Sequence, residues 1–280
     1  MVLMCQNQCL VATVIKNSIP VNELQSFWDH LDELRGSIIR MIVAVVLCAV
    51  VVFCLKDRVF AIVLAPQDSG FITYSILEKV GGMFSKDDGN ILPPLSVRII
   101  NTGLAQQFLL HVKMSAYIGF MLASPYVIYQ LFLFIVPALY HHERRYVLRL
   151  LCSGLLMFVL GIMLSYYLLF PLTFRFLGMY QISQVIENTV TIESYIDTML
   201  TMSLSMGIVF EIPVLCWILG KMGLIGADMM RRYRRHVVVA LLVLGAVITP
   251  TADVFTLLLV SLPMCLLYEI SILIVRRVSV

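Results

Sequence analysis

The sequence predicts an all-α polytopic membrane protein, and three observations predict it: the composition, six long apolar segments, and an uneven distribution of lysine and arginine. Of the 280 residues, 60% are hydrophobic and 13% are charged, and the mean hydropathy is +0.95. Soluble domains are only about half apolar and about a quarter charged. An apolar helix of about 20 residues spans the roughly 30 Å hydrocarbon core and satisfies its own backbone hydrogen bonds. The chain is therefore long enough for several spans.

Six apolar segments are expected to span the membrane, which places both termini on the same side. The fifth reaches only about 21 Å at about 1.5 Å per residue, so the bilayer thins there or neighbouring helices shelter it. The alternative is that its boundary lies a few residues away. Short fifth and sixth spans are therefore predicted, with Pro263 interrupting the sixth. The six segments cover residues 37–55, 106–126, 147–170, 195–219, 236–249 and 254–275.

The basic residues predict the orientation of these spans. Thirteen of the 20 lysines and arginines fall on the side that the termini share, six fall in the opposite loops, and Lys113 falls inside the second span. Because cytoplasmic loops of membrane proteins carry the excess of basic residues, the N-terminus and the C-terminus are both expected in the cytoplasm.

The chain divides into an extension and one membrane domain. Residues 1–25 are expected to form a flexible N-terminal extension, and residues 26–277 the membrane domain. The first residues lack the features of a cleaved signal peptide, so the first span is expected to be retained. Prolines and glycines break residues 56–105 into short pieces, which with residues 171–194 are predicted to form an external cap. Nothing outside the membrane is large enough for a separate enzyme domain.

Two clusters of charge on the predicted cytoplasmic side call for an explanation. Glu33 lies in His-Leu-Asp-Glu-Leu-Arg, residues 30–35, on a short amphipathic helix before the first span. A solvated helix face with local salt bridges is the simplest reading of that stretch. Glu143 lies between the second and third spans, among two histidines and two arginines, and the positive-inside rule does not require it. Two such carboxylates on neighbouring elements can each receive a planar guanidinium group.

One carboxylate is expected inside the membrane. Glu211, in Phe-Glu-Ile-Pro, falls within the fourth span, where a charge costs about 2.5–3.5 kcal/mol unless it meets water, a groove or a partner. It is the strongest functional candidate among the spans. The alternative is a neutral, hydrogen-bonded glutamic acid that only stabilises helix packing. Lys113 and Glu269 lie nearer to span ends and can reach the membrane surface, and Pro213 is expected to kink its helix.

The sequence lacks the motifs that are typical of several classes of enzyme. The sequence contains neither the His-Glu-x-x-His zinc pattern, nor a Gly-x-Ser-x-Gly elbow, nor a phosphate-binding loop. Cys5 and Cys9 are four residues apart but lack a second ligand pair for zinc. The chain is therefore predicted not to be an enzyme, to use no cofactor or metal, and to bind no nucleic acid.

Several motifs, in order along the chain, resemble the TatC family, the multispanning receptor subunit of the twin-arginine protein translocase. They are His-Leu-Asp-Glu-Leu-Arg, Ser-Pro-Tyr-Val-Ile-Tyr-Gln, Phe-Ile-Val-Pro-Ala-Leu-Tyr with His-Glu-Arg-Arg, Phe-Glu-Ile-Pro, and Thr-Pro-Thr-Ala-Asp-Val-Phe. The resemblance implies a glove-shaped bundle of six helices that binds twin-arginine signal peptides at its cytoplasmic face. It assigns Glu33 and Glu143 to the arginine pair of the signal, and Arg35, Phe134 and Arg144 to the same surface.

The resemblance also implies roles for three further residues. Glu211 would line the concave membrane face, Pro66 would belong to the external cap, and Asp253 would mark the turn after the short helix. Single-span amphipathic Tat subunits would assemble with the chain into a multi-subunit complex in the bilayer of the bacterial inner membrane. The protonmotive force would drive the export of folded proteins through it.

Two other functions compete with this one. The first is a proton-coupled transporter of small solutes with Glu211 as the proton carrier, although the internal repeats common in transporters are not found. The second is an intramembrane enzyme, for which the sequence offers no catalytic pairing.

Overall fold

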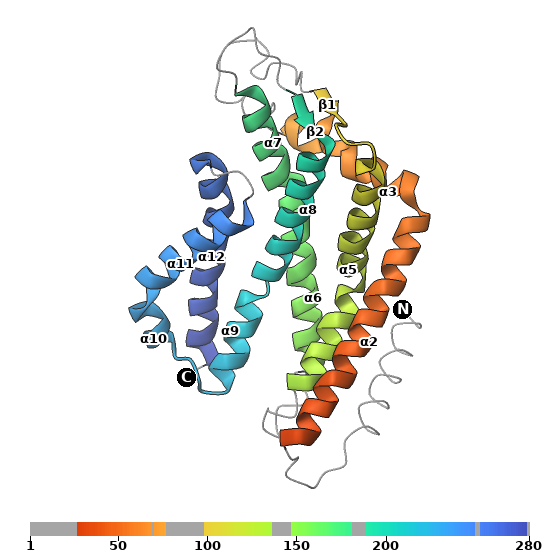
Figure 1. Cartoon of the computed structure of the whole chain (residues 1–280). Helices are drawn as coiled ribbons and strands as arrows, with labels where there is room; N and C mark the ends of the chain where they lie inside the picture. The colour runs from red at the N-terminus through yellow and green to blue at the C-terminus, as the bar shows by residue number, and fades with distance from the viewer. Residues whose placement is uncertain are drawn as a thin grey trace, which may run out of the picture. The chain divides into compact units, whose positions relative to one another are not determined.

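The computed structural model describes residues 27–68, 70–76, 98–135, 147–180, 189–249 and 253–278. The chain divides into two compact units, residues 1–39 and residues 40–280. The first unit contains the first turns of a long helix, and the second contains the remaining elements (Figure 1).

The described residues are almost entirely helical. β1 and β2 form one short parallel ladder in which Arg98 pairs with Thr189 and Ile100 pairs with Thr191. The elements in chain order are α2 (Phe27–Cys54), α3 (Lys56–Leu64), η1 (Ala65–Gln67), β1 (Arg98–Ile100), α5 (Gln106–Ile135), α6 (Val147–Leu164), η4 (Ser165–Leu169), α7 (Phe170–Met179), β2 (Thr189–Thr191), α8 (Ile192–Val209), α9 (Ile212–Lys221), α10 (Ala227–Arg232), α11 (Arg234–Ile248) and α12 (Val254–Val278).

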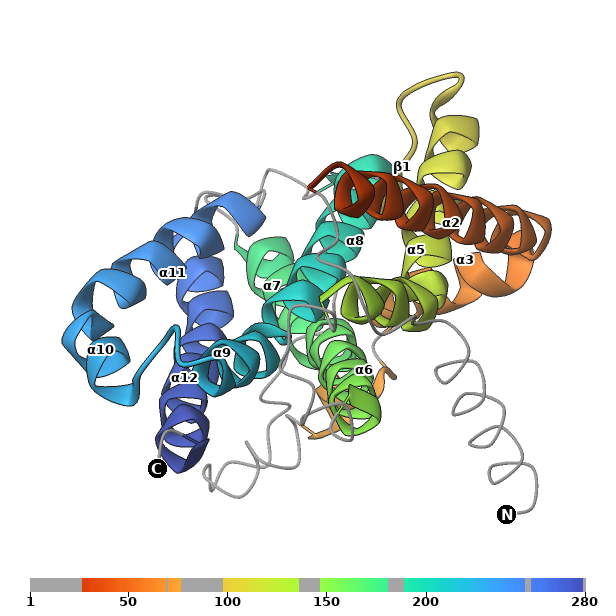
Figure 2. The same ribbon diagram turned by 90° about the horizontal axis from the view of Figure 1, so that it is seen from below.

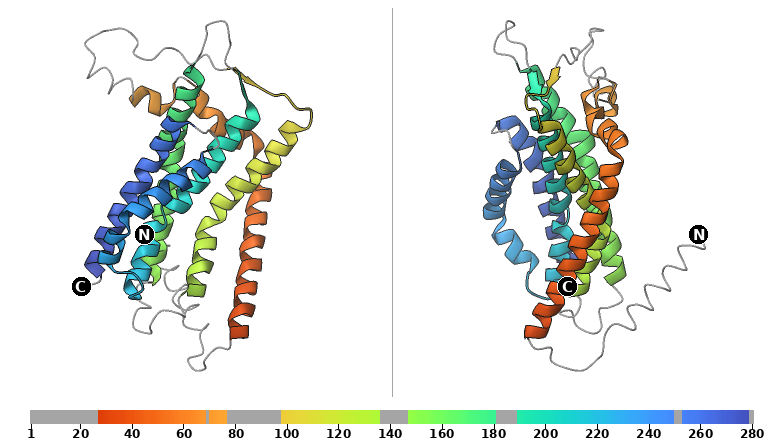
Figure 3. Two further views of the ribbon diagram at one scale, coloured as in Figure 1. Left: turned by 60° about the vertical axis from the view of Figure 1, so that its left-hand side comes forward. Right: turned by 45° about the vertical axis from the view of Figure 1, so that its right-hand side comes forward.

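Two sets of helices pack closely within the second unit. α8 packs against α5 and α6, and α12 packs against α9 and α11 (Figures 2 and 3). Glycines allow close helix contacts, both within these sets and between α5 and α2. A Cβ atom on Gly119 of α5 would lie 2.6 Å from the Cα of Ala49 on α2, and one on Gly220 of α9 would lie 3.2 Å from Cγ1 of Val275 on α12. Such close approach of backbones is typical of helix pairs in membranes.

In the part of the chain that the structure describes, five helical stretches are long and apolar enough to cross a membrane. Four coincide with the predicted first, third, fourth and sixth spans. Lys56–Ile76 also qualifies, although it falls in the predicted external cap. It is not one continuous helix, because Pro66 and the turn around Gly70 divide it into α3, η1 and a helical turn at residues 72–76. The six-span arrangement, the glove shape, the membrane orientation and the domain boundaries stay predictions.

Two helices that contain a proline run further than predicted. The second span was expected to end at Tyr126, but α5 continues through Pro125 to Ile135. Because Pro125 has no N–H, it cannot donate to the carbonyl oxygen of Met121, and the hydroxyl of Ser124 donates to that oxygen instead, at 2.7 Å. The expectation that Pro263 interrupts a short sixth span is also wrong, since α12 runs continuously for 25 residues.

The other predicted boundaries had mixed outcomes. The short fifth span is confirmed in length, because α11 has 15 residues. The fourth span, expected as one helix kinked at Pro213, is an apolar helical stretch over residues 192–221 that is interrupted at Phe210 and Glu211, just before that proline, and so forms α8 and α9. The separate amphipathic helix expected before the first span is also wrong, since residues 27–54 form the single helix α2.

Candidate functional site

The predicted signal-binding residues are only partly within the described structure. Glu33 and Arg35 belong to the first turns of α2, and Arg35 is exposed. Phe134 belongs to the last turn of α5. Glu143 and Arg144 lie outside the described residues, as do the side chains of Glu33 and Phe134. The pairing of Glu33 with Glu143 therefore stays a prediction.

Pro66 lies in a tyrosine-lined junction that ends α3. Pro66 is buried at the N-terminus of η1 and has no N–H to offer the carbonyl oxygen of Ile62, four residues earlier. The hydroxyl of Tyr166 donates to that oxygen at 2.7 Å, and the backbone N–H of Ala65 also donates to it. The carbonyl oxygen of Val63 accepts a hydrogen bond from the hydroxyl of Tyr195 at 3.1 Å. Tyrosines from distant helices thus replace the donors that the end of a helix lacks.

Tyr74 is the central residue of this junction. Its side chain is completely buried, and its hydroxyl lies 3.0 Å from the carbonyl oxygen of Pro66 and 3.3 Å from that of Pro171. The guanidinium carbon of Arg175, itself only 7% exposed, lies 5.1 Å from the Tyr74 ring centroid. This cation–π contact helps to stabilise a buried positive charge. Neither Tyr74 nor Arg175 is among the site residues predicted from the sequence.

Glu211 lies at the break between α8 and α9. It is half-buried and occupies the N-cap position of α9, although its side chain makes no capping hydrogen bond. Its Oε1 atom is buried and has no hydrogen-bond partner among the described residues. Pro213, two residues later, has no N–H to continue the helical ladder from α8. The break therefore places one buried carboxyl group within an otherwise apolar stretch.

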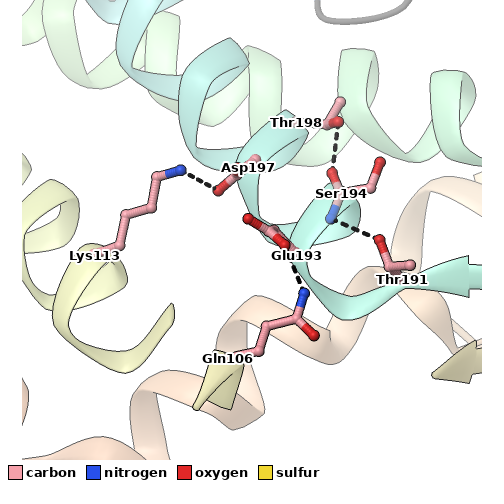
Figure 4. A network of polar contacts seen from close by, with 7 residues as sticks. All are labelled: Gln106, Lys113, Thr191, Glu193, Ser194, Asp197 and Thr198. Carbon is pink, nitrogen blue, oxygen red and sulfur yellow. Dashed lines mark hydrogen bonds and ion pairs between the residues drawn. The ribbon is translucent and has the colours of Figure 1, made fainter. Parts of the chain in front are cut away.

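A polar network joins α5 to the N-terminal half of α8 (Figure 4). The ammonium group of Lys113 lies 2.7 Å from Oδ1 of Asp197, and the amide of Gln106 donates to Oε2 of Glu193 at 2.6 Å. At the start of α8, the hydroxyl of Thr191 accepts from the backbone N–H of Ser194 at 3.2 Å. Lys113 thus has an anionic partner.

Sequence reasoning missed Asp197 and Glu193. Their spacing of four residues places them one helical turn apart, and that was the only signal available. Which helix they face depends on the packing of α8 against α5, whose Lys113 lies far away along the chain. The partner of Lys113 could therefore not be identified from spacing alone.

The Lys113–Asp197 pair is suited to a double-mutant cycle. The two side chains are 43% and 30% exposed, which places the pair in the partly exposed class with a coupling of about 0.5–1 kcal/mol. We expect Lys113→Met and Asp197→Leu to be non-additive by that amount in unfolding measurements of the detergent-solubilised protein. Additive losses would mean that the ion pair contributes nothing to stability.

Asp253, which the resemblance places at the turn after the short helix, contacts the backbone of the next helix. Its Oδ2 atom accepts a hydrogen bond at 2.7 Å from the backbone N–H of Thr256, in the first turn of α12. A side chain that accepts from this position caps a helix N-terminus. The turn before it, residues 250–252, lies outside the described residues. A second charged contact joins α11 to α12, where Nε of Arg234 lies 2.6 Å from Oε1 of Glu269.

Comparison with known proteins identifies the family. Residues 29–263 match the model of the family described as Sec-independent protein translocase protein (TatC). A TatC protein of Blattabacterium sp. subsp. Periplaneta americana is 32% identical over 266 residues, which cover 94% of this chain and 97% of that protein. A TatC protein of Haemophilus influenzae is 31% identical over 264 residues, which cover 91% of each chain.

Solved structures agree with the sequence comparisons. A crystal structure described as the twin arginine translocase receptor TatC superposes with a TM-score of 0.73 at 32% identity, and the match covers 90% of this chain and 100% of that chain. A second crystal structure of the receptor, in the detergent DDM, gives a TM-score of 0.72 at 31% identity. This chain therefore belongs to the TatC family, and it is a non-enzymatic, multi-pass inner-membrane component of the bacterial Sec-independent protein translocase.

Proposed function

We propose that this chain is the core receptor subunit of the twin-arginine translocase and binds twin-arginine signal peptides at its cytoplasmic face. One observation carries the proposal: acidic residues that no topological rule requires, Glu33 and Glu143, occur in two motifs inside the region that matches the TatC family. The description of the similar crystal structure as a twin arginine translocase receptor supports it.

The chemistry of recognition follows from the shape of the two groups. A guanidinium presents parallel N–H donors that match the two oxygens of a carboxylate, so one acidic residue can hold one arginine with two hydrogen bonds. A lysine offers only a point charge on a flexible chain. Two carboxylates therefore distinguish a pair of arginines from a pair of lysines. On this proposal Arg35, Phe134 and Arg144 shape the surface around the two acidic groups.

The rest of the proposal concerns transport. TatC proteins work with other Tat components in a translocase complex. We propose that single-span amphipathic Tat subunits assemble around this chain and that the protonmotive force drives folded cargo across the membrane. Glu211 would face this assembly from the break between α8 and α9, Pro66 would shape the external cap, and Asp253 would hold the turn before α12.

The test is crosslinking of a photoreactive twin-arginine signal peptide to the full chain in inner-membrane vesicles. Because each carboxylate would hold one guanidinium, Glu33→Ala combined with Glu143→Ala is expected to weaken binding about tenfold or more. Asp32→Ala is the matched control, since Asp32 is an exposed carboxylate next to Glu33 in the same helix. It should leave crosslinking unchanged.

A second peptide tests the specificity. A signal peptide with two lysines in place of the arginines should bind the unmodified chain weakly, and the double substitution should change its binding little. If the double variant, present in normal amounts, binds the twin-arginine peptide as well as the unmodified chain does, the proposed role of the two carboxylates is wrong.

A further inference from the structure

A cavity of about 350 Å³ opens between α6, α9 and α12. Its lining is almost entirely apolar. The hydroxyl of Ser153 donates to the carbonyl oxygen of Leu150 in its own helix at 2.8 Å, so this polar side chain is already satisfied. A cavity of this size and composition suits an apolar chain better than a polar solute. The lining residues are Leu150, Ser153, Met157, Pro213, Val214, Trp217 and Ile274.

Two basic residues each lie about one helical turn beyond a residue that lines this cavity. Lys221 follows Trp217 by four residues on α9, and Arg277 follows Ile274 by three residues on α12, so each cation sits on the same helix face as a lining residue. The ammonium group of Lys221 lies 6.0 Å from the centroid of the Trp217 ring. The first residues of α6 and the last residues of α9 and α12 lie at the same end of these helices (Figure 3). Leu150 and Ile274 place the cavity toward that end, which is the predicted cytoplasmic side.

We propose that this cavity binds one acyl chain of an anionic phospholipid, whose phosphate lies between Lys221 and Arg277. An apolar cavity between membrane helices with cations at its rim recognises an amphiphile with an apolar tail and a negative head. A lining tryptophan with an ammonium group beside its ring is suited to the boundary between acyl chains and headgroups. The apolar part of a signal peptide is the other apolar chain that a translocase meets, but such a peptide is cationic and the rim would repel it.

This inference stands apart from the proposed signal-peptide site, because it rests only on the cavity and its two cations. The chain has two tryptophans, Trp28 and Trp217, and the second lines the cavity. Trp28→Phe therefore makes Trp217 the sole fluorescent reporter. The full chain is reconstituted into vesicles of unbrominated phosphatidylcholine that contain increasing fractions of brominated phosphatidylglycerol or brominated phosphatidylcholine with the same acyl chains.

Brominated phosphatidylglycerol is expected to quench Trp217 half-maximally at a mole fraction about threefold or more below that of brominated phosphatidylcholine. Lys221→Gln combined with Arg277→Gln should remove this preference while Trp217 remains quenched by bulk lipid. Arg276→Gln is the matched control. Arg276 is exposed on the same turn but lies two residues from Ile274, off the face of the cavity, so the preference should persist. Ser153→Phe should fill the cavity and weaken quenching by both lipids.

Equal quenching by the two lipids in the Trp28→Phe chain would overturn the proposal, as would a preference that survives the double glutamine variant. Relief of the quenching by a twin-arginine signal peptide, with the two lipids quenching alike, would overturn it too and would assign the cavity to cargo. Lys221→Gln also removes the cation beside the Trp217 ring, so each variant is compared with its own unquenched fluorescence, and its folding is checked by circular dichroism.

Discussion

Tyr74→Ala is expected to reduce the free energy of unfolding by about 3–5 kcal/mol, the range for removing a large buried aromatic side chain. The side chain is fully buried, so the substitution leaves a cavity at the junction of η1, α7 and the helical turn at residues 72–76. It also removes the hydroxyl that lies near the carbonyl oxygens of Pro66 and Pro171, and the ring beside Arg175. Arg175 would then be left as a buried cation without its aromatic neighbour, which adds to the loss.

Tyr74→Phe separates these contributions. It keeps the ring and the contact with Arg175 but removes one hydroxyl, so we expect a loss of only about 1 kcal/mol. Unfolding of the purified variants in detergent, followed by circular dichroism against denaturant, measures both. If Tyr74→Ala lowers the free energy of unfolding by no more than Tyr74→Phe does, the packing of the buried ring does not contribute as expected. Because the predicted signal-binding residues lie outside this junction, Tyr74→Phe should also keep normal crosslinking to the signal peptide.

Gly161→Ala is expected to cost about 2–3 kcal/mol, since it forces two helix backbones apart. A Cβ atom on Gly161 of α6 would lie 2.6 Å from the carbonyl oxygen of Met206 and 3.0 Å from the Cα of Gly207, both on α8. These are backbone atoms and cannot rotate away as a side chain can. The separation of α6 from α8 would also loosen the packing of Phe158 against Gly207 and disturb the break at Glu211 that follows.

Gly36→Ala is the control for Gly161→Ala. Gly36 is also in a helix, but a Cβ atom there would have nothing within 4 Å, so the helical preference of alanine should make the change neutral or stabilising by up to about 1 kcal/mol. The two variants are compared in the same unfolding assay. Equal effects would show that backbone preference, and not the approach of α6 to α8, determines the cost at Gly161.

Much of the fold could be predicted because apolar length is a property of each segment alone. A run of apolar residues that matches the hydrocarbon thickness forms a helix whatever its neighbours are, since the bilayer offers no other partner for its backbone groups. The helical stretches that contain the first, third, fourth and sixth predicted spans follow from this rule, and the short helix α11 follows from its apolar run although it does not reach that thickness. The ordered motifs that resemble TatC proteins are local in the same sense, and the family they indicated is confirmed.

The residues of the functional surface could be predicted from the sequence only in part. The types and order of the acidic residues Glu33, Glu143 and Glu211 can be read from the sequence, and Glu211 stands out because carboxylates are rare within membrane spans. The sequence does not show which atoms form hydrogen bonds or ion pairs with each of these carboxylates. The proximity of Glu33 to Glu143 stays a prediction, whereas the buried Oε1 atom of Glu211 is a property of the fold around it.

By itself, the sequence determined that this is a helical membrane protein, where most of its apolar helices run, and to which family it belongs. Only the tertiary structure decided that Pro125 lies within a continuous helix and that Asp197 pairs with Lys113. It also decided that tyrosine hydroxyls donate to carbonyl oxygens at the end of α3, and that a cavity forms between α6, α9 and α12. Each of these depends on a hydrogen bond, ion pair or packing contact made by a particular neighbour. Most of those neighbours lie on another helix far away in the chain, so no local pattern identifies them.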